Sequence, residues 1–255
     1  MPGALISDDQ LRWLYDHAPV ARHEIRKLIR AGVGVRDVSY RDLVWRCHPR
    51  DNAVERALWL YRGTEEEEEI DWLIGRMQPD QVFCDIGANC GVYALTLRAR
   101  AKARVVAIEP NPIMRARLEE NLRLNALEGV AIEPSAVGDS VGTVTLRMGS
   151  RWDYGQASVL GEASHAGVEV AQRPLTDILA QHAGGRCDAL KIDIEGFEDR
   201  ALAPFLSSAP DASLPASLVI EHLHDVLWRT DLAALAQTRG YTLVKRTRNN
   251  LLLTR

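Results

Sequence analysis

The sequence predicts an α/β fold in which a mostly parallel sheet is covered by helices on both faces, and three observations support this. From residue 81 onward, short apolar runs alternate with segments of helical periodicity, which is typical of a parallel sheet with crossover helices. The run 82–93 is a buried strand that ends in an acid and turns through glycines into a helix. The last two strands are joined by Asn249-Asn250, so we expect the final strand to be antiparallel, at the sheet edge.

Length and composition limit the classes of protein to which this chain can belong. The 255 residues are 46% hydrophobic and 26% charged, enough for one large domain with a small extension. We therefore expect a helical N-terminal extension over residues 1–57, which covers a main domain over residues 58–255. The net charge of −4 gives no overall field that would attract nucleic acid or an anionic membrane. The four cysteines form no C-x-x-C pair and the N-terminus resembles no export signal, so we expect a cytoplasmic location.

The N-terminal part is expected to be mainly helical. Ser7 begins a capping box, and apolar residues recur at helical spacing in two short helices over 7–31. A more extended stretch follows over 38–47, and then a helix over 65–77. The glutamate run 65–69 suits the positive end of that helix, and we expect it to face water.

The main domain is expected to alternate strands and helices. The strands are expected at 81–85, 104–109, 130–137, 188–194, 217–221, 241–246 and 251–254. The helices are expected at 91–101, 112–126, 175–183, 196–207 and 230–239. A hairpin-rich insert is expected over 141–173, and within it residues 151–156 are a candidate lid or acceptor loop.

The turn after the first strand of this domain is a candidate ligand cradle, because ligands of open α/β sheets lie beyond the carboxyl ends of the strands. Asp85 begins a D-x-G-x-x-x-G pattern that continues through Gly87, Ala88, Asn89 and Gly91. The two glycines let backbone N–H groups and a helix N-terminus approach a polar ligand. Asn89 stands where the dinucleotide fingerprint has its second glycine, which disfavours a nicotinamide cofactor.

The ends of the next two strands indicate an adenosine-containing ligand. Glu109, followed by Pro110, lies 24 residues after Asp85, where an acid can accept hydrogen bonds from both hydroxyls of a ribose. The third strand runs into small residues whose backbone suits the edge of a purine, namely Ser135, Ala136 and Val137.

A row of charged side chains marks the fourth strand. Lys191, Asp193 and Glu195 alternate with apolar residues and so share one face. A central parallel strand is normally apolar on both faces, and an unpaired buried charge is costly. The charged row is therefore expected to line a site.

These residues resemble the FkbM-type methyltransferases over roughly residues 58–254. The resemblance rests on the stretches 85–91, 108–111 and 136–139, and above all on the octapeptide Lys-Ile-Asp-Ile-Glu-Gly-Phe-Glu at 191–198. It implies a Rossmann-like class I methyltransferase fold with a seven-stranded sheet, and S-adenosylmethionine as the cofactor. Gly87, Asn89 and Gly91 would then hold the methionine part and Glu109 the ribose. The residues expected to bind the cofactor are Asp85, Gly87, Ala88, Asn89, Gly91, Glu109, Pro110, Ser135, Ala136 and Val137.

The substrate class that the resemblance implies is a hydroxyl of a small molecule, such as a sugar or a natural-product intermediate. Such an acceptor has to lose a proton during methyl transfer. The catalytic candidates are the charged row and the two residues that end the fifth strand, namely Lys191, Asp193, Glu195, Glu221 and His222. His222 equally suits a plain loop role, and Lys191 either pairs with Asp193 or orients the acceptor.

Several alternatives stay open at this stage. A small-molecule N-methyltransferase is the closest rival, followed by a non-catalytic S-adenosylmethionine-binding protein and by a dehydrogenase. A nucleic-acid methyltransferase is disfavoured because the chain carries neither an N/D-P-P-Y/F loop nor a Pro-Cys nucleophile. We expect no metal, since the possible ligands Asp193, Glu195, His222, His224 and Asp225 do not have the spacing of a strong metal motif.

Overall fold

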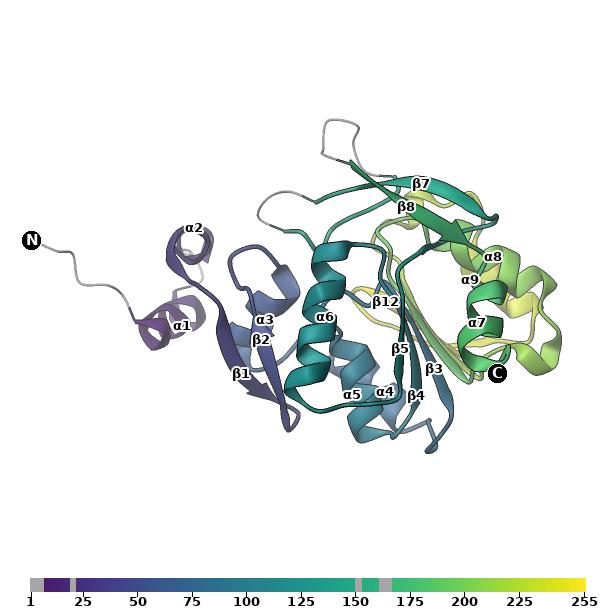
Figure 1. The fold of residues 1–255 in the computed structure, drawn as a ribbon, viewed down its shortest axis with the longest axis horizontal. Coiled ribbons are helices and arrows are strands. Elements are labelled where there is room, and N and C mark those ends of the chain that lie inside the picture. The colour runs from purple at the N-terminus through teal and green to yellow at the C-terminus, as the bar shows by residue number, and fades with distance from the viewer. Residues whose placement is uncertain (1–6, 19–21, 150–152, 161–166) are drawn as a thin grey trace, which may run out of the picture.

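A seven-stranded sheet with helices on both faces forms the centre of the fold (Figure 1). This computed structural model describes residues 7–18, 22–149, 153–160 and 167–255. Across those residues, the strands lie in the order β11 (Thr242–Arg246), β12 (Asn250–Thr254), β10 (Ser217–Glu221), β9 (Ala189–Ile192), β3 (Val82–Ile86), β4 (Arg104–Ile108) and β5 (Val130–Glu133).

The strand directions confirm a mostly parallel sheet. Strands β10, β9, β3, β4 and β5 pair in parallel, whereas β12 is antiparallel to both β10 and β11. The expected position of β12 is wrong, because it lies inside the sheet and β11 is the edge strand. The reason is hydrophobicity: Leu251, Leu252 and Leu253 of β12 are buried, while every residue of β11 is exposed.

Two groups of helices cover the sheet, each over its own apolar core. On one face lie α4 (Glu67–Ile74), α5 (Val92–Arg100) and α6 (Pro112–Leu124). On the other face lie α7 (Leu175–Ala183), α8 (Glu198–Ser208) and α9 (Leu232–Thr238). None of the helices in the described part of the chain has the length and apolar character needed to cross a bilayer.

The N-terminal part adds a hairpin and a third helix to the two that the sequence predicts. Its elements are α1 (Asp8–His17), α2 (Arg22–Gly32), β1 (Arg36–Tyr40), β2 (Leu43–Cys47) and α3 (Ala53–Tyr61). The capping box at Ser7 is confirmed. Helix α3 runs across the sequence-based boundary at 57/58, and Trp45 and Trp59 are fully buried in the same core as α5. Residues on both sides of that boundary therefore share one core.

A small second sheet lies over the carboxyl ends of the strands (Figure 1). The expected strand 130–137 is divided at Pro134, which has no N–H to donate. The short strand β6 (Ala136–Val137) after this break pairs with β8 (Gly167–Arg173), which in turn forms an antiparallel hairpin with β7 (Gly142–Arg147). The hairpin-rich insert is thus confirmed.

Candidate active site

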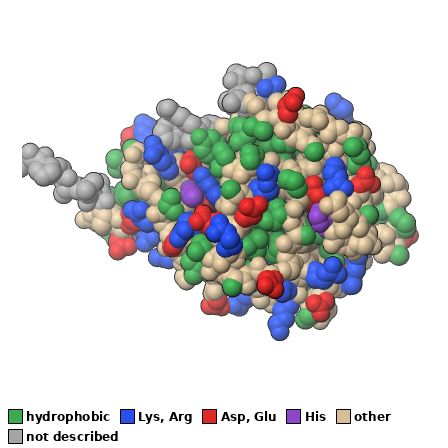
Figure 2. All heavy atoms as spheres, in the orientation of Figure 1, with side chains coloured by type: hydrophobic (Ala, Val, Ile, Leu, Met, Phe, Trp, Pro, Cys, Tyr) green, Lys and Arg blue, Asp and Glu red, His purple; other side chains and the backbone are tan. Residues whose placement is uncertain are grey.

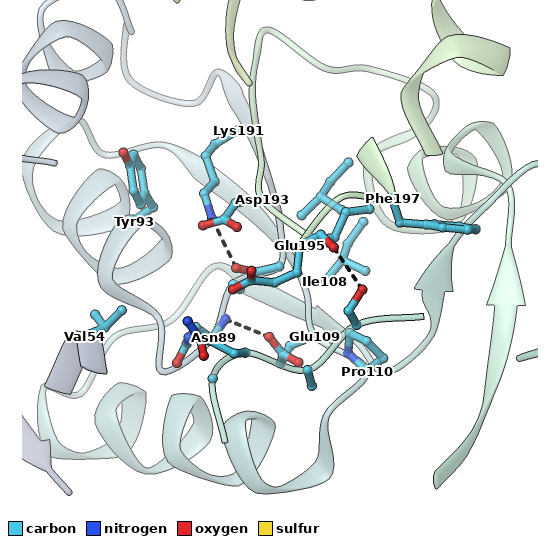
Figure 3. A pocket seen from close by; sticks show the side chains of 18 of the residues that line it. Val54, Asn89, Tyr93, Ile108, Glu109, Pro110, Lys191, Asp193, Glu195 and Phe197 are labelled. Atoms are coloured by element: carbon cyan, nitrogen blue, oxygen red, sulfur yellow. Dashed lines mark hydrogen bonds and ion pairs between the residues drawn. The ribbon is translucent and has the colours of Figure 1, made fainter. Parts of the chain in front are cut away.

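A pocket lies at the carboxyl ends of β3, β4 and β9, as expected for an open α/β sheet. Its walls come from the turn after β3, the residues after β4 and β9, the loop after β7, and α3 (Figure 3). Among the sequence candidates, the residues that line it are Gly87, Ala88, Asn89, Glu109, Pro110, Ala136, Val137, Lys191, Asp193 and Glu195. The candidates that lie behind the walls are Asp85, Gly91, Ser135, Glu221 and His222.

The glycine turn is pressed against the end of β9. Gly87 has a φ of +79°, and a Cβ atom on it would lie 1.9 Å from the backbone oxygen of Asp193. The N–H groups of Gly87 and Ala88 both donate to the carbonyl of Ile108. Behind the turn, the Asp85 carboxylate accepts a hydrogen bond from the Ala94 N–H at 3.0 Å and so holds the first turn of α5. The turn therefore ties three neighbouring strand ends together.

Gly87→Ala is expected to lower the free energy of unfolding by about 2–4 kcal/mol, since both the positive φ and the backbone clash oppose a Cβ atom. Urea denaturation measures this. Gly142→Ala is the matched control, because a Cβ atom at this first residue of β7 meets no atom within 4 Å, and it should change stability by less than about 0.5 kcal/mol. Equal stability of the two variants would show that the turn does not need glycine at position 87.

Glu109 presents a fixed, buried carboxylate to the pocket (Figure 3). One oxygen accepts a hydrogen bond from the Asn89 N–H at 2.7 Å and the other from the Asn111 N–H at 2.8 Å. Each oxygen keeps a lone pair for a further donor, which suits a pair of ribose hydroxyls. Burial raises the pKa of Glu109 to about 7 in spite of these two bonds.

Lys191 is a buried cation at the opposite side of the pocket (Figure 3). Its ammonium group donates to the carbonyl of Gly87 at 3.2 Å and lies 3.5 Å from Asp193 and 3.9 Å from Asp85. Burial alone lowers the pKa of Lys191, but the carboxylates of Asp193 and Asp85 outweigh burial and raise it. Of the two roles left open by the sequence, pairing with Asp193 is therefore the one that these contacts support.

The acidic residues at the carboxyl ends of β9 and β10 lie close to Asp193. Strand β9 ends at Ile192 rather than at Ile194, and Glu195 lies in a turn with a φ of 57°. The Glu195 carboxylate lies 3.0 Å from His224 Nε2, and burial followed by the charge of Asp193 raises its pKa to about 8. The pKa of Glu221 is raised to about 8 for the same two reasons.

Two other parts of the sequence interpretation change at this site. His222 lies away from the pocket, with its ring nitrogens 3.3 Å from the Thr247 carbonyl and from the Arg246 guanidinium. The expectation that the glutamate run faces water is wrong for Glu66, which lines the pocket and accepts a hydrogen bond from Asn250 at 2.7 Å. It is also wrong for Glu69, which is buried.

Several residues that sequence reasoning missed also line the pocket. They are Ala53 and Val54 of α3, Thr64 and Glu66 before α4, Tyr93 of α5, and Ser158. Asn52 followed three residues later by Glu55 is an N-cap signal that would have revealed α3. In the candidate loop 151–156, Arg151 and Trp152 lie outside the described residues, whereas Asp153, Gly155 and Gln156 line the pocket.

Comparison with known proteins assigns the family. Residues 85–230, more than half of the chain, match the family model of the methyltransferase FkbM domain. The chain belongs to the FkbM methyltransferase family. It is therefore an S-adenosylmethionine-dependent methyltransferase, and the octapeptide 191–198 and the cradle 85–91 both fall within the matched region. The resemblance to the FkbM family, which implied S-adenosylmethionine as the cofactor, is confirmed.

Individual relatives of this FkbM-family chain match it either at low sequence identity or over a short stretch. It is 24% identical over 204 residues to the methyltransferase sdnD of Sordaria araneosa, covering 68% of this chain and 78% of sdnD. It is 51% identical over 47 residues to the AMB antimetabolite synthetase AmbE of Pseudomonas aeruginosa, which is 18% of this chain and only 2% of AmbE. The structure of M. jannaschii TYW2 in complex with AdoMet aligns with 14% identity and a TM-score of 0.44, covering 87% of this chain and 85% of TYW2.

The pocket of this FkbM-family chain fits S-adenosylmethionine. Glu109 offers acceptors for a ribose, and Gly87, which lines the pocket and packs against the Asp193 carbonyl, presents only backbone there. Within the described residues, the buried hydroxyl of Tyr93 has no hydrogen-bond partner although Tyr93 lines the pocket. The methionine end of the cofactor carries both donors and acceptors that would satisfy such a group.

Proposed function

We propose that this chain is an O-methyltransferase that transfers the methyl group of S-adenosylmethionine to a hydroxyl of a small molecule. The observation that carries the proposal is the division of one pocket into two ends. Glu109 lies at one end, and Lys191, Asp193 and Glu195 lie at the other (Figure 3). The glycine turn lies between them, because the Asn89 N–H donates to Glu109 and the Gly87 carbonyl accepts from Lys191. Cofactor binding requires a hydrogen-bond acceptor for the ribose, and hydroxyl activation requires a carboxylate such as Asp193 that can take the proton.

At the cofactor end, we propose that Glu109 holds the ribose and that Gly87, Ala88 and Asn89 lie along the methionine part. Pro110 and Val137 would border the adenine. The bound cofactor supplies a methyl group on a sulfonium, whose positive charge disappears as the methyl group is transferred. Much of the catalytic effect should therefore come from alignment within a pocket that excludes water.

At the acceptor end, we propose Asp193 as the group that takes the hydroxyl proton. Its side chain is 32% exposed and lines the pocket, and it lies 3.5 Å from the Lys191 ammonium. Glu195, with its pKa of about 8, is mostly protonated at pH 7 and so is better suited to donate a hydrogen bond to the acceptor. Glu221 and His222 lie behind the pocket walls, and we propose for them no direct contact with the acceptor.

We propose a small molecule as the substrate because other parts of the chain enclose the pocket opposite the strand ends. Helix α3, Asp153 and residues 155–159 line it together with the strand ends, and Asn111 of the cofactor end donates to the carbonyl of Tyr154 at 2.8 Å. Basic and acidic side chains are interspersed on the face drawn in Figure 2, unlike the basic stripe typical of nucleic-acid binding. The name of the AmbE relative, an antimetabolite synthetase, supports a role in natural-product chemistry.

The experiment incubates the full chain with S-adenosylmethionine and a panel of acceptor pairs that differ only in carrying a hydroxyl or an amine. Mass spectrometry then measures the gain of one methyl group. We expect methylation of a hydroxyl member, and Asp193→Asn should lower its rate by about 10²–10⁴-fold while S-adenosylhomocysteine still binds. Methylation of only the amine members would overturn the O-methyl assignment in favour of N-methylation, which the acidic acceptor end would also suit.

Binding of the cofactor is expected to strengthen as pH rises through about 7, the pKa of Glu109. The ionised carboxylate accepts from the ribose hydroxyls, whereas the protonated form competes for them. If only the ionised form binds, the affinity for S-adenosylhomocysteine should rise about tenfold between about pH 6 and pH 8. Calorimetry across this range measures the rise, and the part of it due to Glu109 should be missing in Glu109→Gln. An unchanged pH profile in that variant would rule out this linkage.

A further inference from the structure

We propose that Asp193 and Glu221 bind a divalent cation, next to Glu198, at the acceptor end of the pocket. Carboxylate oxygens of these three residues all lie within 4.8 Å of one another. They come from three separate elements: the turn after β9, the end of β10 and the start of α8. The expectation of no metal, drawn from sequence spacing, does not take this convergence into account.

Strand register brings the two proposed ligands together. Strands β9 and β10 are parallel neighbours, with Ile192 opposite Ile220. The residues that follow these two, Asp193 just after β9 and Glu221 at the last position of β10, therefore lie side by side at the edge of the sheet. Such pairs at adjacent strand ends do not share a local spacing in the sequence, so a motif search does not find them.

Glu221 supplies an independent indication of a missing ligand. Its side chain is buried, with 4% exposure, and one oxygen accepts a hydrogen bond from the Leu223 N–H at 2.8 Å. The other oxygen is buried and has no hydrogen-bond partner among the described residues. A buried acceptor left in this state is costly, and a native protein normally satisfies it by a hydrogen bond, an ion or a water molecule.

The neighbouring carboxylates make a positive ion the better partner. Glu198 is held in place by hydrogen bonds from the Ile194 N–H, the Gly196 N–H and the Trp228 indole at 2.8, 3.1 and 2.8 Å. These donors hold the Glu198 carboxylate in place beside Asp193 and Glu221, while burial raises the pKa of Glu198. Negative charges this close together oppose one another, so a bound cation would offset the cost of ionising these carboxylates.

The nearby basic groups are already engaged. Lys191 lies between Asp85 and Asp193, while His224 contacts Glu195. Arg200, which comes from the same helix as Glu198, contacts Asp199 at 3.2 Å. An added cation would therefore balance charge that these contacts leave uncompensated.

The donor set defines the class of cation. Carboxylate oxygens alone favour Mg²⁺, Mn²⁺ or Ca²⁺ over zinc or copper. Mg²⁺ in particular is commonly held by one or two carboxylates, with water and substrate oxygens at its other positions. Because Asp193 lines the pocket, an ion on one of its oxygens would be positioned to bind the acceptor hydroxyl and favour transfer of the hydroxyl proton to the other Asp193 oxygen. This role rests on the proposed function, whereas binding of the ion does not.

The test is a titration of the full chain with Mn²⁺ after treatment with a chelator, followed by the electron paramagnetic resonance signal of free Mn²⁺. We expect one saturable site per chain, with Mg²⁺ competing for it. Glu221→Gln should weaken binding at least about tenfold, the loss of one charged ligand. Glu119→Gln, on the exposed surface of α6, is the matched control and should bind Mn²⁺ as the wild type does.

Binding of S-adenosylhomocysteine to each variant provides the check on folding, and Glu221→Asp, which keeps the charge, should bind Mn²⁺ more tightly than Glu221→Gln. Absence of saturable Mn²⁺ binding to the wild type would overturn the proposal. A proton shared between the carboxylates would then account for the reduction of their negative charge. Equal Mn²⁺ affinity in Glu221→Gln and the wild type would overturn it too. Failure of the hydroxyl methylation assay would contradict the proposed function and leave the Mn²⁺ result unaffected.

Discussion

Lys191→Met is expected to lower the free energy of unfolding by about 3–5 kcal/mol, the usual cost of removing one partner of a buried ion pair. Methionine keeps much of the length of the side chain but removes the charge. The variant leaves Asp85 and Asp193 without their shared cation and the Gly87 carbonyl without its donor. Urea denaturation at pH 7 measures the change.

Lys27→Met is the matched control for this prediction. Lys27 lies 2.9 Å from Glu24 in a surface pair whose side chains are 57% and 68% exposed, and such pairs contribute about 0–1 kcal/mol. The contrast between the two lysines isolates burial, because the substitution is the same. If Lys191→Met costs no more than Lys27→Met, Lys191 is not the group that compensates the buried acids at the end of β9.

Glu109→Gln is expected to weaken binding of S-adenosylhomocysteine by about 100-fold or more. Hydrogen bonds to a charged group contribute about 1.5–3 kcal/mol each, and two ribose hydroxyls give about 10²–10⁴-fold in affinity. Glutamine has nearly the same size, so the pocket keeps its shape. One amide oxygen can still accept, but the NH₂ group meets the N–H of Asn89 or Asn111 as a second donor. Calorimetry measures the affinity.

Glu119→Gln serves again as the control, because it makes the same chemical change on the exposed surface of α6. It should leave the affinity unchanged. A Glu109→Gln variant that binds S-adenosylhomocysteine as tightly as this control would show that the ribose does not lie on Glu109, and the orientation proposed for the cofactor would then be wrong.

The sequence predicts the strand ends of this site because parallel strands place their carboxyl ends at one edge of the sheet. Asp85 and Glu109 each follow an apolar run, and Lys191 and Asp193 lie near the end of a third strand, so their convergence follows from the alternation of strands and helices alone. The glycine turn is predictable for a similar local reason, since Gly87 and Gly91 both adopt a positive φ.

What the sequence does not reveal depends on contacts between segments distant in the chain. Glu66 lies in a run typical of a solvated helix end, yet Asn250 of β12 holds it at the pocket. The proximity of Asp193 and Glu221 can be predicted only when the β9–β10 register is known. The inner position of β12 can be predicted only by comparing its buried residues with the exposed residues of β11. None of these relations has a local pattern.

A crystal structure of the full chain with S-adenosylhomocysteine tests most directly the claim that one pocket holds cofactor and acceptor at opposite ends. We expect the ribose hydroxyls to donate to Glu109 and the sulfur to face Asp193 across the pocket. A ligand whose ribose lies away from Glu109, or whose sulfur faces away from Asp193, would contradict the account.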